Sequence, residues 1–170
     1  SIVSGVGDVN GDGFDDFLIG GNGNDDGGSN AGQSYLILGK SSGWNMDTDL
    51  SLSDASFIGE IVNDRSGVSV SGAGDVNGDS FDDFLIGTLS GKSYLILGRS
   101  SGWNMGTDLS LSDASFIGEN INDYSGSSVS GVGDVNGDGF DDFLIGARGN
   151  DDGGSNAGKS YLVLNIPTIG

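Results

Sequence analysis

The stretch GVGDVNGDGFDDFLIG, residues 5–20, decides the architecture because the chain carries it three times. It recurs unchanged at 131–146, and a copy with two substitutions, Ala73 and Ser80, occupies 72–87. A second block of 27 residues, 34–60, recurs at 93–119 with changes at positions 99 and 106 only. Such self-similarity is typical of repeat architectures, in which each copy is one supersecondary unit. The sequence therefore predicts three repeats, at 1–60, 61–119 and 120–170.

A full repeat has the pattern of four short strands, here represented by 66–74, 16–20, 34–39 and 55–59. The first strand has small side chains, which suit an inner strand crowded by neighbouring sheets. The second and third are apolar at successive positions, so they belong to a sheet covered on both sides. Four-stranded sheets of this kind are typical blades of a β-propeller, so we predict an all-β fold. A solenoid of stacked sheets is the alternative.

The third repeat lacks its outer strand. After the strand expected at 160–165, the chain offers only a short tail, in which Pro167 is a poor strand residue. Propellers close with about four to eight blades, so three repeats are too few. We therefore expect an incomplete ring in which 160–165 pairs with other chain segments or another subunit. We therefore also expect the chain to self-associate into a dimer, ring or fibre.

Composition excludes several classes of function. The chain has 25 acidic against 6 basic residues, a net charge of −19, which argues against a nucleic-acid partner. It has no His and no Cys, which excludes His- or Cys-based nucleophile pairs, His/Cys zinc sites and disulfides. No apolar run approaches the roughly 20 residues of a membrane span, so we expect no membrane insertion. No signal peptide is present, and the first residue is Ser1, so we expect a processed or excised piece.

The loop at residues 8–16 has the pattern of a metal site. Oxygen-bearing side chains stand at its positions 1, 3, 5 and 9, and Gly13 at position 6 permits a turn with positive φ. Ca²⁺ takes about six to eight oxygen ligands in such flexible geometry. We expect one Ca²⁺ per repeat, bound by these side chains and by the carbonyl at position 7. The ligand sets are Asp8, Asn10, Asp12, Phe14 and Asp16; Asp75, Asn77, Asp79, Phe81 and Asp83; and Asp134, Asn136, Asp138, Phe140 and Asp142.

Other residues of the loops have different expected roles. Val9 should anchor its loop by packing inward. The aspartates at position 8 should cap or hydrogen-bond locally; they are Asp15, Asp82 and Asp141. An EF-hand is excluded because position 12 is Ile19, inside a strand. Three acidic turns that bind nothing are the alternative.

The stretch 20–25 resembles the start of a β-roll repeat, but we interpret it as a hairpin tip. Weak binding of a further ion at Asp25/Asp26 and at Asp151/Asp152 is an open alternative.

The block SVSGVGDVNGDGFDDFLIGA, residues 128–147, resembles the FG-GAP repeat of integrin α-subunit propellers and their bacterial relatives. The resemblance covers all three copies. It implies a propeller, usually seven-bladed, with Ca²⁺ loops between the first and second strands, in an extracellular or cell-surface setting. It also implies roles in adhesion and recognition. Ser66-Gly67 and Ser125-Gly126 stand where the family has Phe-Gly, so the bacterial type is closer.

These features together predict a non-enzymatic, calcium-binding adhesion or recognition scaffold with a protein or glycan partner at the cell surface. Three alternatives stay open. One is a structural subunit of a surface layer or extracellular fibre, whose copies pack against neighbouring chains. A lectin-like carbohydrate-binding propeller would use Trp44 and Trp103, although these more readily anchor the polar linkers. An accessory domain of a secreted hydrolase is least favoured, because an enzyme rarely carries its site in triplicate.

Overall fold

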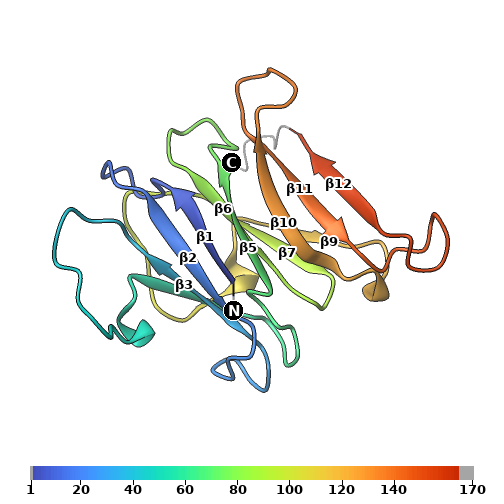
Figure 1. Cartoon of the computed structure of the whole chain (residues 1–170), viewed down its shortest axis with the longest axis horizontal. Coiled ribbons are helices and arrows are strands. Elements are labelled where there is room, and N and C mark those ends of the chain that lie inside the picture. The colour runs from blue at the N-terminus through green and yellow to red at the C-terminus, as the bar shows by residue number, and fades with distance from the viewer. Residues whose placement is uncertain (1, 165–170) are drawn as a thin grey trace.

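The computed structural model describes residues 2–164 of the 170-residue chain. It is an all-β structure of three open sheets that follow one another along the chain (Figure 1). The first sheet has the order β1 (Ile2–Gly7), β2 (Asp16–Gly21), β3 (Gln33–Ile37), β4 (Ala55–Ile58). The second has the order β5 (Ser69–Gly74), β6 (Asp83–Gly87), β7 (Lys92–Ile96), β9 (Ala114–Ile117). The third has β10 (Ser125–Gly133), β11 (Asp142–Ala147), β12 (Lys159–Val163). The predicted all-β class is confirmed.

The only helical segments among residues 2–164 are three single 3₁₀ turns: Leu50–Leu52, Leu109–Leu111 and Ile121–Asp123. The first two lie in the polar linkers before β4 and β9. In each, an aspartate caps the turn by accepting the N–H of a serine, as Asp49 does from Ser51.

One strand was missed by the sequence analysis. β8 (Thr107–Asp108) lies in the second polar linker and pairs in parallel with β4, so the first sheet has a fifth strand. The N–H of Gly106 donates to Oγ of Ser56 at 2.8 Å beside this pairing. The linker of the second repeat therefore covers the outer edge of the first sheet, which would otherwise expose unpaired backbone groups.

The inner strands β1, β5 and β10 pack against one another in chain order. Their glycines permit this approach: a Cβ added to Gly72 would lie 3.0 Å from Cα of Val6. A Cβ added to Gly131 would lie 2.5 Å from the carbonyl oxygen of Gly72. The expectation that small residues serve a crowded inner strand is confirmed.

Two apolar clusters join the sheets. One contains Leu18 and Leu36 of the first sheet with Phe84 and Ile86 of the second. The other contains Leu85 and Leu95 of the second sheet with Val129, Phe143 and Ile145 of the third. All five residues of β6 are buried, because the middle sheet is covered on both faces as the sequence predicted.

Within residues 2–164, β12 has no strand on its outer side. The predicted strand 160–165 corresponds to β12, while Asn165 and the tail to Gly170 lie outside the described residues. No helix in the described part of the chain is long and apolar enough to span a membrane.

Candidate functional site

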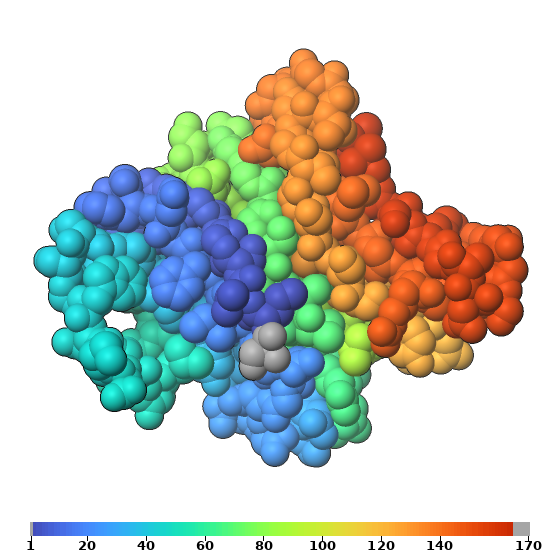
Figure 2. Space-filling view, viewed as in Figure 1, coloured from blue at the N-terminus to red at the C-terminus, as the bar shows by residue number. Residues whose placement is uncertain are grey.

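The three acidic loops connect the inner strand of each sheet to the next strand. They follow β1, β5 and β10, and they lie at the same end of the sheets in chain order (blue, green and orange in Figure 1). In Figure 2 the third loop, in orange, projects at the upper edge, and the second lies between it and the first. A register shift between Gly5 and Gly7 ends β1 and turns the chain into the first loop, and the other two junctions do the same.

The aspartate at position 1 organises each loop. In the first loop, Oδ1 of Asp8 accepts the N–H of Gly11 at 2.7 Å and of Asp12 at 3.0 Å. Its Oδ2 accepts the N–H of Gly13 at 2.8 Å. The equivalent three bonds form at Asp75 and Asp134. The backbone of every loop is therefore wound around one carboxylate, and the N–H groups of Gly139 and its neighbours hold the pKa of Asp134 below its ordinary value.

The side chains at positions 3 and 5 face each other. Nδ2 of Asn10 donates to Oδ2 of Asp12 at 2.9 Å, while Oδ1 of Asn10 accepts the N–H of Asp12 at 2.9 Å. Oδ1 of Asp12 also accepts the N–H of Phe14 at 2.9 Å. The other two loops repeat this arrangement with matching distances.

The aspartate at position 9 begins the second strand and is buried in all three repeats. In the middle repeat, Asp83 accepts the N–H of Val76 at 2.9 Å and of Gly98 at 2.7 Å. The pKa of Asp83 is raised to about 7, chiefly by burial and also by the charges of Asp79 and Asp75, against the lowering effect of the two N–H groups. Burial likewise raises the pKa of Asp16, with contributions from Asp12 and Asp8. In these two loops, the charges of the neighbouring carboxylates thus raise the pKa of the aspartate at position 9.

Position 6 has the conformation that the sequence predicted. Gly13 and Gly139 have φ of 88° and 93°, and Ser80 has φ of 73°. Ser80 therefore holds a left-handed conformation that costs a non-glycine residue about 1 kcal/mol. Val9 is fully buried, so its predicted inward packing is confirmed.

The donor set of each loop consists of three carboxylates, one amide and backbone carbonyls, all of them oxygen donors suited to a hard cation. In the described part of the chain, no three acidic side chains converge on a single ion-sized centre. Their oxygens instead accept backbone N–H groups. The oxygen donors of each loop fit Ca²⁺ in chemical type, but their side chains do not surround a single ion position in this structure.

The aspartates at position 8 correct one expectation. Oδ2 of Asp82 accepts the N–H of Asp8 at 2.8 Å, and Oδ2 of Asp141 accepts the N–H of Asp75 at 3.0 Å. Local hydrogen bonding was therefore the wrong prediction for Asp82 and Asp141, because both bond to the preceding repeat. Successive side chains of extended backbone point in opposite directions, so position 9 faces its own loop and position 8 faces the neighbour.

The FG-GAP repeat family model matches residues 2–37 and 125–163, which contain the first and third loops. The chain therefore contains FG-GAP repeats. FG-GAP repeats occur in integrin-like extracellular adhesion modules, and the family is typically non-enzymatic. A comparison with curated proteins found no similar chain.

At the opposite end of the sheets, the FG-GAP protein has two long hairpin tips. Oδ1 of Asp25 accepts the N–H of Asn30 at 2.7 Å, and Asp151 makes the same bond to Asn156 at 2.6 Å. Asp152 forms an ion pair of 2.7 Å with Lys159. These are hydrogen-bonded turns, as the hairpin interpretation predicts.

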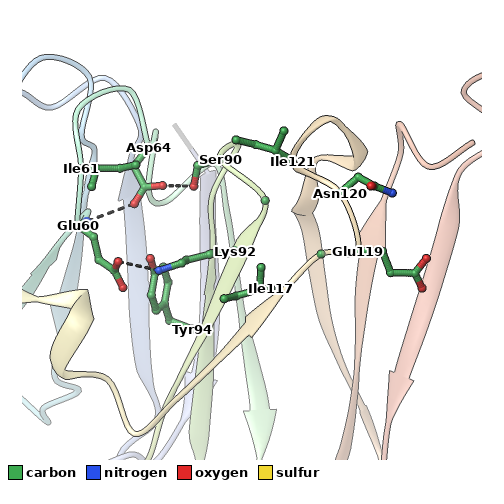
Figure 3. Close-up of a pocket in the computed structure, with 12 residues that line it drawn as sticks. Glu60, Ile61, Asp64, Ser90, Lys92, Tyr94, Ile117, Glu119, Asn120 and Ile121 are labelled. Atoms are coloured by element: carbon green, nitrogen blue, oxygen red, sulfur yellow. Dashed lines mark hydrogen bonds and ion pairs between the residues drawn. The ribbon is translucent and has the colours of Figure 1, made fainter.

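The middle hairpin is eight residues shorter, and a cavity of about 430 Å³ lies beside it (Figure 3). Ile117 and Ile121, both more than 70% exposed, line one side, and the ion pair of Lys92 with Glu60 lines another. In the first repeat, by contrast, the long tip lies against Ile58, the counterpart of Ile117. The shorter hairpin of the FG-GAP protein thus accounts for the cavity.

The two tryptophans hold the polar linkers to the sheets. The ring of Trp103 lies 6.0 Å from that of Phe84 and 6.5 Å from that of Phe57, against the first apolar cluster. Trp44 lies 6.3 Å from Phe17 and is 54% exposed. Both indole N–H groups donate to carbonyls of their own linkers. The anchoring role expected for the tryptophans is confirmed most clearly for Trp103.

Proposed function

We propose that this FG-GAP protein is a calcium-binding, non-enzymatic scaffold for adhesion or recognition, at the cell surface or outside the cell. One observation carries the proposal: the same oxygen donor set, with the same internal hydrogen bonds, occurs in three loops at one end of the molecule. A catalytic centre would not need three copies. Three rigid loops on a repeated framework suit the display of a binding surface.

Calcium is the cation that this donor set favours. The chain has no His or Cys, so the soft and borderline metals that prefer nitrogen or sulfur lack their ligands. Mg²⁺ demands near-ideal octahedral geometry, whereas Ca²⁺ accepts flexible coordination by carboxylates, amides and carbonyls. The side chains at positions 1, 3, 5 and 9, with the carbonyl at position 7, would hold the ion. The ion would neutralise the loop and fix its backbone.

We further propose that the three sheets are blades of a propeller whose ring other chain segments or subunits complete. The packing of β1 on β5 and of β5 on β10 supports this arrangement, because inner strands line the axis of a propeller. We also propose that the boundaries between successive repeats fall at 60/61 and 119/120. The fibre or surface-layer alternative is favoured because the first and third loops of the described chain present complementary surfaces, through which copies of the chain would join. The lectin alternative is not favoured, because the ring of Trp103 packs against Phe84 and Phe57, and Lys40 lies over the ring of Trp44.

Calcium titration by calorimetry tests the metal assignment. The metal-free protein should bind three Ca²⁺ ions per chain, one per loop. Asp12→Ala, Asp79→Ala and Asp138→Ala should each remove one ion from the stoichiometry, and the matched hairpin variant Asp26→Ala should remove none. Absence of a binding heat, or a stoichiometry unchanged in the loop variants, would contradict the assignment.

An adhesion assay tests the role as a scaffold. Immobilised protein should retain cells or surface glycoproteins in Ca²⁺ and release them in chelator. The triple variant that combines Asp12→Ala, Asp79→Ala and Asp138→Ala should not retain them. Equal retention with and without the metal loops would show that the loops serve another purpose.

A further inference from the structure

Consecutive loops are joined by a reciprocal pair of hydrogen bonds. The N–H of Asp8 donates to Oδ2 of Asp82 at 2.8 Å, and the N–H of Asp82 donates to the carbonyl of Asp8 at 3.2 Å. The next junction repeats both bonds between Asp75 and Asp141, at 3.0 Å and 3.1 Å. Because two different junctions have the same contacts, this clamp belongs to the repeat itself and not to one place in the chain.

Apolar contacts accompany the clamp at both junctions. The ring of Phe81 lies over Gly11, where an added Cβ would come within 2.6 Å of its Cε1. The ring of Phe140 lies over Gly78 in the same way, with 2.5 Å. Val9 and Val76, next to the clamped aspartates, are 0% and 1% exposed. Each loop that has a following repeat therefore buries its valine and has an aromatic ring of that repeat beside its glycine.

The third loop presents this surface uncovered by any residue from 2 to 164. The N–H of Asp134 makes no hydrogen bond in the described chain, unlike those of Asp8 and Asp75. Val135 is 52% exposed, and no atom lies within 4 Å of a Cβ built on Gly137. The acceptor and the ring that cover this position at the other two junctions are absent here.

The first loop presents the complementary surface. The carboxylate of Asp15, the counterpart of Asp82 and Asp141, accepts no hydrogen bond from the described residues and is exposed. Phe14 is 43% exposed, whereas Phe81 and Phe140 are partly covered. On β1, a Cβ built on Gly5 would meet no atom within 4 Å, although its counterparts Gly72 and Gly131 are packed against backbone.

We infer that the first repeat of one copy docks on the third repeat of a second copy through the contacts that join repeats within the chain. The carboxylate of Asp15 accepts the N–H of Asp134 in the other copy, Phe14 covers Gly137, and Val135 is buried. The occupant is a second copy because the required surface is the one that this chain carries at its first loop. The interface is head-to-tail, so repetition closes a ring or extends a fibre.

This inference rests on the proposed propeller arrangement and specifies its interface. The loops that meet are acidic and the chain carries a charge of −19, so repulsion opposes docking. Bound Ca²⁺ would reduce that repulsion, and added salt would screen it. Association should therefore be stronger in Ca²⁺ than in chelator at low ionic strength, and this difference should shrink as salt is added.

Sedimentation of two variants blocked at opposite ends tests the interface. In Ca²⁺ the unmodified chain should associate. Asp15→Ala, blocked at the first loop, and Val135→Glu, blocked at the third, should each weaken association at least about 10-fold, the effect of a lost hydrogen bond to a charged group or of a buried charge. Asp26→Ala, with the same charge change on a hairpin tip, should associate like the unmodified chain. Val135→Ser replaces Val135→Glu if the latter lowers the melting temperature.

The decisive sample is a mixture of the two blocked variants. Each keeps one intact surface, so the mixture should form a species of two chains and nothing larger. A monomeric unmodified chain, full association of Asp15→Ala, or a monomeric mixture would each overturn the interface. Association that survives both variants would assign the contact to the edge of β12. Calorimetry on monomeric Asp15→Ala reports calcium binding separately, so failure of the metal assignment and failure of the interface are distinguishable.

Discussion

Asp141 accepts the backbone N–H of Asp75 at 3.0 Å across 66 residues of sequence and returns its own N–H to the Asp75 carbonyl at 3.1 Å. The acceptor is a carboxylate that belongs to one loop, and the donor begins the loop of the preceding repeat. The loops are thereby coupled to one another at the end of the molecule where we propose that calcium binds.

Removal of this coupling should destabilise the protein. Asp141→Ala deletes the acceptor and leaves the partly buried N–H of Asp75 without its partner. We expect a loss of about 1–3 kcal/mol in the free energy of unfolding, measured by urea denaturation in chelator. Asp15→Ala is the matched control: it makes the same change at the same loop position, but its carboxylate has no partner within the described chain. At monomeric concentration it should change stability by less than about 0.5 kcal/mol. Equal effects of the two variants would contradict a role for the clamp.

Calcium should control the melting temperature. Three Ca²⁺ ions would reduce the net charge from −19 to −13, since −19 + 6 = −13. A ligand that binds only the folded state stabilises it by about 2.7 kcal/mol per site at 100 times its Kd. Differential scanning calorimetry should show a large fall in melting temperature in chelator and a recovery that is greater with Ca²⁺ than with Mg²⁺. An identical melt in chelator and in Ca²⁺ would remove the basis of the metal proposal.

The middle loop should bind calcium most weakly. Ser80 is held at φ 73°, where its counterparts are Gly13 and Gly139. Ser80→Gly should relieve about 1 kcal/mol of strain and tighten the middle site several-fold. The reverse exchange, Gly13→Ser, should weaken the first site by a similar factor. Calorimetric titration of both variants checks this, and a Ser80→Gly protein with unchanged or weaker affinity would refute the strain argument.

Asp64 should give the metal-free protein a distinctive pH dependence. Its side chain is buried beside the cavity, where it accepts hydrogen bonds from Ser90 and from the N–H of Glu60. Burial raises its pKa above the ordinary value of 3.8; the charge of Glu60 raises it further, while the two hydrogen bonds and the charge of Lys92 lower it. A raised pKa means that the folded state binds the proton more tightly than the unfolded state. The contribution of Asp64 to stability is therefore largest at acid pH and declines as the pH rises above about 4 and through the raised pKa.

Comparison with Asp64→Asn isolates that contribution from the charge of the whole chain. The free energy of unfolding of the unmodified protein, minus that of the variant, should fall as the pH rises above about 4 in urea titrations with chelator. A difference that stays constant or rises with pH would show that Asp64 is not held in this environment.

The local structure could be predicted from the order of residues along the chain. Repetition of 5–20, the apolar runs and the position of Gly13 were enough to predict an all-β fold, the approximate strands and the shape of the loops. These features depend on neighbouring residues: side-chain alternation sets a strand, and a glycine with positive φ sets a turn. The inward packing of Val9 follows from the same pattern.

The contacts between repeats could not be predicted in this way. Asp15, Asp82 and Asp141 occupy the same loop position with nearly the same neighbours in sequence, yet only the latter two bond to another loop. β8 was missed for a similar reason, because its partner β4 lies in the preceding repeat and its own sequence is that of a linker. Such contacts depend on how whole sheets pack, which local propensity does not encode. Identical residues therefore acquire different roles according to whether a neighbouring repeat stands beside them.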